Sequence, residues 1–476
     1  MRQADPMADP KADPKADGAD RLHALDVVWL EMQGAGPPIA IGTVAVAQGP
    51  TPSADEVRTL ISQRLDRMPR LAQELSRDAL GIRRPEWVPS AGFDLAAHVH
   101  QLSARHHAAT GGLDVAVGHV MEQPLPAEQP LWDVWIVDGL GDGWALVWRV
   151  HHTVADGVGT ELLLGHCFDL EADGGMTLAE AAAAAASPAS NSVEGEPREQ
   201  PFPRPRREHG HGHGIGDALG ALLGAAEHAV PALGALVPHP PGSLTGEVGQ
   251  GRTWVSVDVP LARVRAVGRA HGATVNDVVL ACVAGGFREL LIQRGEPVAG
   301  RTVRTLVPVS MRPVGDSDAH NELSGMLARL PIGVDDPVQR LSGVQEALSH
   351  SRGFGTPALG SLLLGLVDRV VPAGLQDVSV AVAGRQVPAW FLDTVTTNVP
   401  GPQFPLYLCG RRVTAMYPVI PIAGHTCITI GIFSYDGMLN VGVTGDADQA
   451  GDVDVLARGI RHSASELEDR LGPLSR

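Results

Sequence analysis

The chain is poor in several features that mark particular classes of protein, beginning with cysteine. Its 476 residues contain four cysteines, and no two of them stand in a Cys-x-x-Cys pair. With no such spacing and no secretory segment, the sequence predicts reduced, mostly buried thiols in a cytoplasmic protein. The four are Cys167, Cys282, Cys409 and Cys427.

Basic charge and long apolar runs are also scarce. The chain carries 37 Lys and Arg against 54 Asp and Glu, which gives a net charge of −17. This acidic balance argues against nucleic acid as a partner, and no window reaches the roughly 18 uncharged apolar residues of a transmembrane helix. Residues 1–20 repeat Ala, Asp, Pro and Lys without an apolar core, so they predict a disordered tail and no signal peptide.

Beyond this tail the composition is that of a globular protein. Hydrophobic residues make up 44% of the chain and charged residues 19%. We predict a first α/β unit over 21–171, a linker with an apolar helix over 172–250 and a second α/β unit over 251–476. Within the linker, the alternating His and Gly of 209–213 favour a solvated segment over a metal site.

Hydrophobic periodicity places helices and strands along both units. Ser53 with Glu56 three residues later is typical of a capping box, so an amphipathic helix is predicted over 53–68. The segment Thr274-Val275-Asn276-Asp277 is predicted to cap a helix that continues to Leu291. Further helices are expected at 22–30, 111–123, 160–170, 215–237, 261–271, 359–371 and 453–471, and strands at 39–47, 144–148, 254–259, 302–309, 378–382, 391–395, 413–416, 426–433 and 439–444.

The segment His151-His152-Thr153-Val154-Ala155-Asp156-Gly157 combines groups suited to acid–base chemistry. It follows an apolar run and a polar break at Arg149, so the histidines are expected where a buried strand opens into a turn. A histidine held there can take a proton from a hydroxyl and return it. Asp156 can brace the turn, and Gly157 permits a positive φ or a close backbone approach. An ordinary strand end followed by an Asp-Gly turn is the alternative.

Arginines gather in the second unit, within residues 288–312. They can meet a phosphate-bearing ligand despite the acidic total, or they can form a solvated face. The sequence leaves both interpretations open. These arginines are Arg288, Arg294, Arg301, Arg304 and Arg312.

Seven segments keep an order and spacing that are found together in one known family. They are residues 22–31, Pro130-Leu131-Trp132, residues 151–157, residues 274–281, Ser310-Met311-Arg312-Pro313, residues 397–402 and Tyr435-Asp436-Gly437. With these segments in this order, the chain resembles the bacterial wax ester synthase/acyl-CoA:diacylglycerol acyltransferases, within the chloramphenicol-acetyltransferase-like superfamily. The resemblance extends over nearly the whole chain after Leu22, and His320-Asn321 departs from the more usual Gly-Asn.

The resemblance implies a fold and a set of site residues. The implied fold is α/β, with two chloramphenicol-acetyltransferase-like lobes, each a mixed β-sheet flanked by helices, and an active-site tunnel between them. His152 would be the general base, and a role for the Asn276 amide at a developing oxyanion stands beside the alternative that Asn276 only caps its helix. The implied catalytic residues are His151, His152, Asp156 and Gly157, and the implied substrate-binding residues are Asn276, Asp277, Arg312 and Asn398.

The resemblance also implies a reaction. A long-chain acyl group would pass from acyl-CoA to diacylglycerol or a fatty alcohol, giving triacylglycerol or wax ester. Acyl-CoA is then a substrate, and neither a cofactor nor a metal is expected. The enzyme would associate peripherally with the inner membrane face or with lipid droplets. Two alternatives stay open: a related CoA-dependent acyltransferase with another acceptor, and a lipid-binding or lipid-droplet surface protein with weak activity.

Overall fold

The computed structural model describes most of the two α/β units. The described residues are 20–22, 26, 27, 29, 30, 37–77, 84–105, 112–155, 157–186, 242–309, 324–353, 392–422 and 424–471. Several predictions lie outside these residues: the tail up to residue 19, the histidines of 209–213, the helices at 215–237 and 359–371, and the strand at 378–382.

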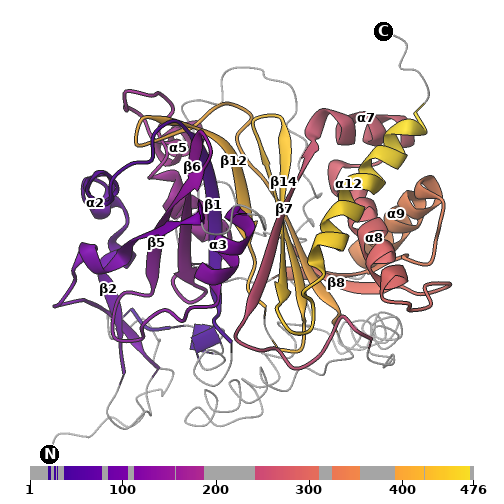
Figure 1. Cartoon of the computed structure of the whole chain (residues 1–476), viewed down its shortest axis with the longest axis horizontal. Coiled ribbons are helices and arrows are strands. Elements are labelled where there is room, and N and C mark those ends of the chain that lie inside the picture. The colour runs from indigo at the N-terminus through magenta and orange to yellow at the C-terminus, as the bar shows by residue number, and fades with distance from the viewer. Residues whose placement is uncertain are drawn as a thin grey trace, which may run out of the picture.

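Two mixed sheets of six strands each form the framework, and Figure 1 shows them side by side. The first sheet consists of β1 (Ala40–Gln48), β4 (Val99–Ser103), β5 (Trp132–Leu140), β6 (Gly143–His151), β11 (Tyr407–Leu408) and β12 (Arg411–Val419). Its spatial order is β11-β12-β1-β6-β5-β4, so β6 lies in its interior. A separate hairpin pairs β2 (Gln73–Ser76) with β3 (Glu86–Pro89).

The second sheet has the order β7-β14-β13-β10-β8-β9. Its strands are β7 (Arg252–Pro260), β8 (Val303–Val309), β9 (Ser324–Leu330), β10 (Thr394–Pro400), β13 (Ile428–Tyr435) and β14 (Met438–Asp446). Both sheets mix parallel and antiparallel pairs, because β4 runs parallel to β5 and β10 runs parallel to β13. The predicted α/β fold of two lobes with mixed sheets is therefore present.

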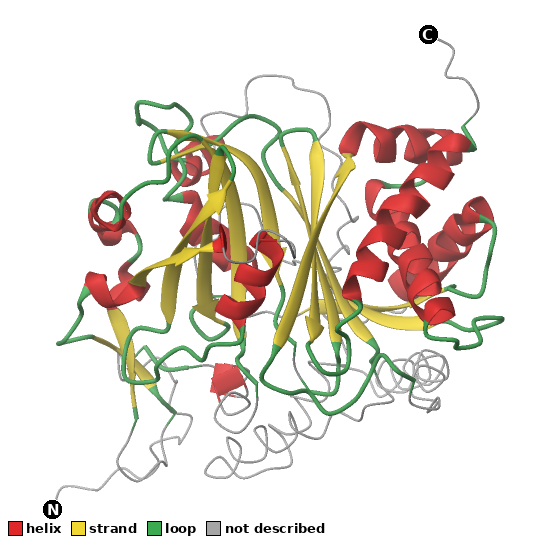
Figure 2. Ribbon diagram, viewed as in Figure 1, coloured by secondary structure: helices red, strands yellow, loops and turns green. Residues whose placement is uncertain are grey.

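Helices flank both sheets, and Figure 2 shows the helices of the second lobe gathered on the outer face of its sheet; the described residues contain four of them. These four are α7 (Leu261–His271), α8 (Val275–Gln293), α9 (Pro337–Gly353) and α12 (Val453–Asp469). α8 and α12 approach closely at a glycine, because a Cβ on Gly286 would lie 2.7 Å from the carbonyl oxygen of Leu456. The helices of the first lobe are α2 (Ala54–Ser62), α3 (Gly112–Met121), α4 (Gly157–Gly165) and α5 (Leu178–Ala186).

The two lobes are joined by a strand that the second half of the chain contributes to the first sheet. β12 pairs antiparallel with β1, and the register places Tyr417 opposite Val44. The first sheet thus includes residues far beyond 171, so the boundaries 21–171 and 251–476 do not separate the two lobes. Strand pairing between distant segments leaves no local mark in the sequence, which is why periodicity missed this exchange.

Partly buried polar contacts connect the lobes at this junction. The Tyr417 hydroxyl on β12 donates to Asp258 on β7, at 3.0 and 3.1 Å from the two carboxylate oxygens. Asn440 on β14 donates to the same carboxylate at 2.7 Å. Two residues earlier, on the same face of β7, the Ser256 hydroxyl donates to Asp114 of α3 at 3.0 Å. The relative placement of the lobes is therefore held by hydrogen bonds as well as by apolar packing.

Local patterns predicted many elements correctly and misjudged others. The helix at 261–271 has its predicted bounds, and the Ser53–Glu56 capping box is present. The helix expected over 53–68 ends at Ser62 and is followed by short 3-10 turns. The alanine run assigned to the linker begins as α5, which Thr177 and Glu180 cap. The strands β5 and β9 and the helix α9 were not predicted.

Candidate active site

The two histidines of the motif stand where β6 ends. Every side chain of β6 from Trp144 to His151 is buried. The backbone N–H of His151 donates to the Leu131 carbonyl at 2.9 Å, and its carbonyl accepts from the N–H of Val154 at 2.9 Å. This second bond closes a turn in which His152 is a central residue. The predicted strand opening into a turn is confirmed.

His151 is fully buried, and its Nδ1 is bonded within the turn, whereas its Nε2 is buried with no hydrogen-bond partner among the described residues. Its Nδ1 accepts from the backbone N–H of Thr153 at 3.1 Å and lies 2.8 Å from the Thr153 hydroxyl. Because a backbone N–H can only donate, neutral His151 carries its proton on Nε2. Burial, and then the neighbouring His152, lower the pKa of His151 to about 3. His151 is therefore neutral at physiological pH, and its accepting nitrogen is already occupied.

His152 has a different environment. Its side chain is half-buried, and its ring is stacked on the indole of Trp29, with ring centroids 4.3 Å apart and planes that differ by 14°. Trp29 is also half-buried and belongs to the helical residues near the start of the chain. Of the two histidines, only His152 has a partly exposed side chain, although its Nδ1 is buried.

An aromatic stack supports the strand beneath the histidines. Trp132 is stacked on Trp148, with centroids 5.3 Å apart, and on His98, with centroids 4.5 Å apart. The Trp132 indole N–H donates to the Leu71 carbonyl at 2.7 Å, and His98 Nδ1 donates to the Trp132 carbonyl at 2.7 Å. The Pro130-Leu131-Trp132 segment thus supplies both this platform and the carbonyl that pairs with His151.

The polar break at Arg149 is a buried ion pair. Arg149 Nε donates to Asp133 Oδ1 at 2.8 Å, and a second guanidinium nitrogen donates to Asp133 Oδ2 at 2.5 Å. A further nitrogen donates to the carbonyls of Val120 and Gln123, the latter at 2.7 Å. The pair joins β5 and β6 to the end of α3, two residues before His151. Sequence reasoning recognised Arg149 only as an interruption of the apolar run.

The remaining residues of the motif are described only in part. Asp156 lies outside the described residues, and so does Arg312 of the second unit. Gly157 is the first residue of α4. The roles predicted for Asp156, Gly157 and Arg312 therefore stay predictions.

The other predicted cluster lies at the start of α8. Thr274 is the N-cap, and its hydroxyl accepts from the backbone N–H of Asp277 at 3.2 Å. The Asp277 carboxylate in turn accepts from the backbone N–H of Thr274 at 2.8 Å. This reciprocal pair is a capping box. Asp277 thus has a structural role, and its predicted part in substrate binding stays a prediction.

Asn276 does not cap the helix, and the structure brings it together with Asn398. Asn398 on β10 donates from Nδ2 to Asn276 Oδ1 at 3.1 Å. The Nδ2 of Asn276 is buried and has no hydrogen-bond partner among the described residues. Its amide N–H groups are thus directed away from Asn398 and are available to an acceptor. The alternative that Asn276 only caps α8 is wrong, because the cap is Thr274.

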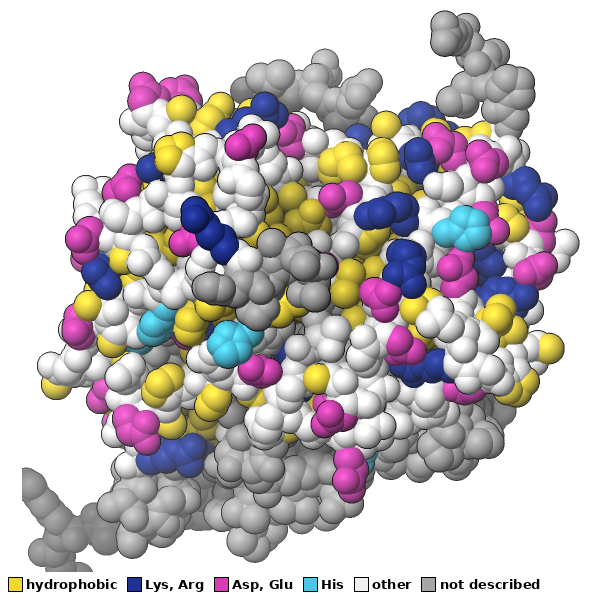
Figure 3. Space-filling view, in the orientation of Figure 1, with side chains coloured by type: hydrophobic (Ala, Val, Ile, Leu, Met, Phe, Trp, Pro, Cys, Tyr) yellow, Lys and Arg dark blue, Asp and Glu magenta, His cyan; other side chains and the backbone are white. Residues whose placement is uncertain are grey.

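Three arginines of the cluster in the second lobe form ion pairs with carboxylates. Arg288 pairs with Asp335 at 2.8 Å, and Arg294 pairs with Asp452 through two nitrogens, one of them at 2.8 Å. Arg301 pairs with Glu296 at 2.5 Å. Figure 3 likewise shows basic and acidic side chains interspersed over this lobe on the face in view. Among the described arginines, these three support the solvated, paired interpretation.

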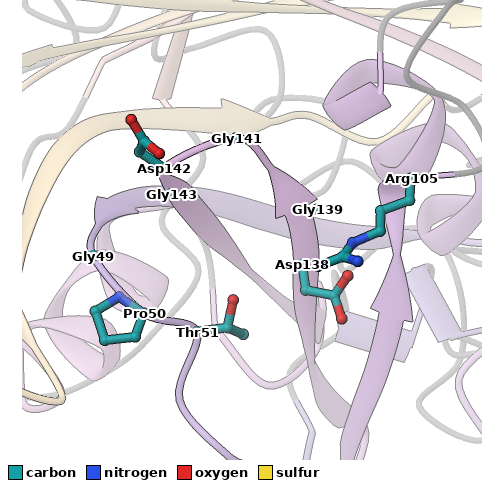
Figure 4. Close-up of a pocket in the computed structure, with 9 residues that line it drawn as sticks. All are labelled: Gly49, Pro50, Thr51, Arg105, Asp138, Gly139, Gly141, Asp142 and Gly143. Carbon is teal, nitrogen blue, oxygen red and sulfur yellow. The ribbon is translucent and has the colours of Figure 1, made fainter.

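An open hollow of about 600 Å³ lies at the other end of β6, around the β5–β6 hairpin (Figure 4). Its lining includes Gly143, the first residue of β6, and the side chains of Arg105 and Asp138. At about 3.3 Å per residue, the length of β6 separates it from His151 by about 26 Å. The hollow is therefore not part of the histidine site.

Comparison with known proteins identifies the family. Residues 22–279 match the model of the wax ester synthase/diacylglycerol acyltransferase catalytic domain. The chain belongs to this family. Residues 319–468 match the model of its C-terminal domain, so the match includes both lobes. The predicted family and its class of activity, acyl transfer, are confirmed.

Relatives and solved structures agree with this membership. A Mycobacterium tuberculosis protein named probable diacylglycerol O-acyltransferase is 33% identical over 432 residues, covering 90% of this chain and 91% of its own. A wax ester synthase/diacylglycerol acyltransferase from Marinobacter aquaeolei VT8 matches with a TM-score of 0.64 at 22% identity, covering 95% and 100% of the two chains. The first condensation domain of the CDA synthetase matches with a TM-score of 0.55 at 19% identity, covering 95% and 96%. The structural matches confirm the predicted fold class.

Proposed function

We propose that the enzyme transfers a long-chain acyl group from acyl-CoA to diacylglycerol or a fatty alcohol, with His152 as the general base. Family membership supports the substrate classes. The observation that carries the proposal is the contrast between the two histidines. His151 is buried with its accepting nitrogen occupied by Thr153, whereas His152 is half-buried at the turn.

The proposed reaction needs one group that carries a proton and one group that donates a hydrogen bond to the oxyanion. His152 takes the proton of the acceptor hydroxyl while the hydroxyl oxygen attacks the thioester carbonyl carbon. The resulting tetrahedral intermediate collapses, the carbon–sulfur bond breaks, and the imidazolium returns the proton to the CoA thiolate. The products are an ester and CoA, with no acyl-enzyme. The Asn276 amide, oriented by Asn398, donates to the carbonyl oxygen as negative charge develops on it.

The first experiment measures thiol release from palmitoyl-CoA with hexadecanol or dioleoylglycerol as acceptor, and lipid chromatography identifies the ester. His152→Ala is expected to lower kcat by about 10²- to 10⁴-fold, the usual contribution of a general base. His151→Asn is the matched control, because the Asn amide oxygen can accept from Thr153 as Nδ1 does. Equal activity of His152→Ala and wild type would reject the base assignment.

The same assay separates the alternatives. Ester formation with one acceptor names the acceptor class. If the folded wild type releases no thiol with either acceptor, a different acceptor or a lipid-binding role with weak activity replaces the proposal. Binding of palmitoyl-CoA without turnover would favour the lipid-binding role.

We also propose peripheral association with the inner membrane face or with lipid droplets. None of the helices among the described residues is long and apolar enough to cross a bilayer. The sequence of 215–237 is apolar and rich in Ala, Leu and Gly. Deletion of 215–237 is expected to reduce flotation of the full chain with phospholipid vesicles or triacylglycerol droplets. Unchanged flotation would reject a role for this segment.

A further inference from the structure

Trp29 lies flat against the ring of the proposed base. Its indole and the His152 imidazole have centroids 4.3 Å apart and planes that differ by 14°. The two residues are 123 positions apart in the sequence, which is 152 minus 29. Nothing in the local pattern around Trp29 indicates this contact: the sequence placed Trp29 in a short helical segment that also fits the family resemblance, and gave it no role.

We propose that Trp29 is a positioning residue of the acyl-transfer site. Its indole holds the plane of the His152 ring and favours the imidazolium that forms when His152 accepts the hydroxyl proton. This inference rests on the proposed function, because it requires His152 to be the general base.

The position of His152 explains why a restraint on its ring is useful. His151 is the last residue of β6, so His152 lies in the turn beyond the strand ladder. The torsion that sets the plane of a histidine ring has broad, roughly two-fold minima. An indole stacked in parallel limits rotation about this torsion without taking up a ring nitrogen. The stack therefore orients the ring of the proposed base through its face.

The same contact acts on the charge that appears during the reaction. The face of an indole carries the negative part of the ring quadrupole and attracts a cation placed over it. The neutral imidazole of the resting enzyme gains less from this attraction than the imidazolium of the transition state. An interaction that is stronger in the transition state than in the ground state raises kcat and leaves KM nearly unchanged.

The first lobe offers a matched control pair. Trp135 on β5 lies opposite His100 on β4, with ring centroids 4.5 Å apart and planes that differ by 33°. Like Trp29 and His152, both residues are half-buried. Replacing Trp135 therefore reports what the loss of a tryptophan–histidine contact does to folding, away from the proposed base.

The test measures kcat and KM of the full-length enzyme with palmitoyl-CoA and the preferred acceptor. Trp29→Phe keeps an aromatic face, whereas Trp29→Leu and Trp29→Met keep apolar volume without one. We expect Leu and Met to lower kcat about 10- to 100-fold, the scale of a misplaced catalytic group, with KM within about two-fold of wild type. Phe is expected to keep at least about a third of the wild-type kcat. Trp135→Leu is expected to lower the Tm but not the kcat of the folded enzyme.

A second readout distinguishes positioning of a base from general support of the fold. A hexadecanol that carries fluorine on C2, next to the carbon that bears the hydroxyl, has a more acidic hydroxyl than hexadecanol. Its attack on the thioester therefore depends less on a general base. The loss caused by Trp29→Leu is expected to shrink several-fold with this acceptor. A loss of equal size with both alcohols would indicate a structural role and overturn the inference.

The remaining outcomes are also decisive. Wild-type kcat in Trp29→Leu or in Trp29→Met overturns the inference, and the second variant serves if the first does not fold by circular dichroism. Equal losses in Trp29→Phe and Trp29→Leu also overturn it, because the aromatic face is then irrelevant. An inactive His152→Ala beside a fully active Trp29→Leu rejects only the positioning role. A fully active His152→Ala rejects the proposed function itself.

Discussion

The turn after β6 and the start of α8 each present two polar residues close together, and in each the two have opposite environments. In the turn, His151 is buried and bonded to Thr153, two residues away, whereas His152 is stacked on the distant Trp29. One histidine of the turn is thus hydrogen-bonded within its own segment, and the other contacts a segment from elsewhere in the chain.

The start of α8 shows the same contrast, here between a carboxylate and a side-chain amide. Asp277 closes the capping box with Thr274, three residues away, whereas Asn276 meets Asn398 from β10. The difference teaches that a motif is not a set of equivalent site residues. Local hydrogen bonds identify the residue that holds the backbone, and its neighbour is instead held by a contact with a distant segment.

After His152→Ala, the largest effect is expected for Asn276, the residue at the start of α8 that contacts β10. Asn276→Ala removes the proposed oxyanion donor, and loss of one such donor lowers kcat by about 10²- to 10³-fold. The Tm is expected to stay near that of wild type, because Thr274 and Asp277 still cap α8. Steady-state kinetics with palmitoyl-CoA check this. A wild-type kcat would place Asn276 outside the reaction.

The buried histidine of the turn is expected to control stability at low pH. Burial lowers the pKa of His151 from 6.5 to about 3. Between these pH values the unfolded chain binds the proton and the folded protein does not, so stability falls as the pH falls through this window. The slope attributable to one such group is about 1.4 kcal/mol per pH unit.

His151→Asn removes this titration while an amide oxygen still accepts from Thr153. The variant is expected to show a shallower loss of unfolding free energy between pH 6.5 and pH 4, measured by urea unfolding at several pH values. His152→Asn is the matched control and is expected to keep the wild-type slope more closely. Identical slopes for wild type and His151→Asn would contradict the buried, neutral state of His151.

The smallest effect is expected for the local residue of the helix start. Asp277→Ala breaks the capping box and should lower the unfolding free energy by about 1 kcal/mol. The kcat of the folded enzyme should stay within about three-fold of wild type. Urea unfolding and kinetics on the same preparation test both statements. A large loss of kcat at unchanged stability would instead support the substrate-binding role predicted for Asp277.

Features whose cause is local could be predicted from the sequence. The Ser53–Glu56 capping box, the helix at 261–271 and the strand that ends at His151 all depend on residues within a few positions of one another. The helix that continues to Leu291 was also predicted, because apolar residues at helical spacing mark it. The motif residues themselves were recognised by type and order.

Features that depend on distant partners could not be predicted in this way. β5 was missed although it pairs along β6, and β12 was assigned to the wrong lobe. Arg149 looked like an interruption until Asp133 was found beside it. The arginine cluster suggested a phosphate site until three of its members proved to be paired with carboxylates.

By itself, the sequence determined that the protein is globular, many of its helices and strands, and its family. Composition, short-range periodicity and the order of motifs can all be read from the sequence of residues alone. Only the tertiary structure decided which motif residues are hydrogen-bonded within their own segment and which are oriented by a contact with a distant segment. The burial of His151, the stack of Trp29 on His152 and the bond from Asn398 to Asn276 each join a motif to surroundings built from other segments. Such contacts depend on how the sheets pair and pack, and no local pattern records that.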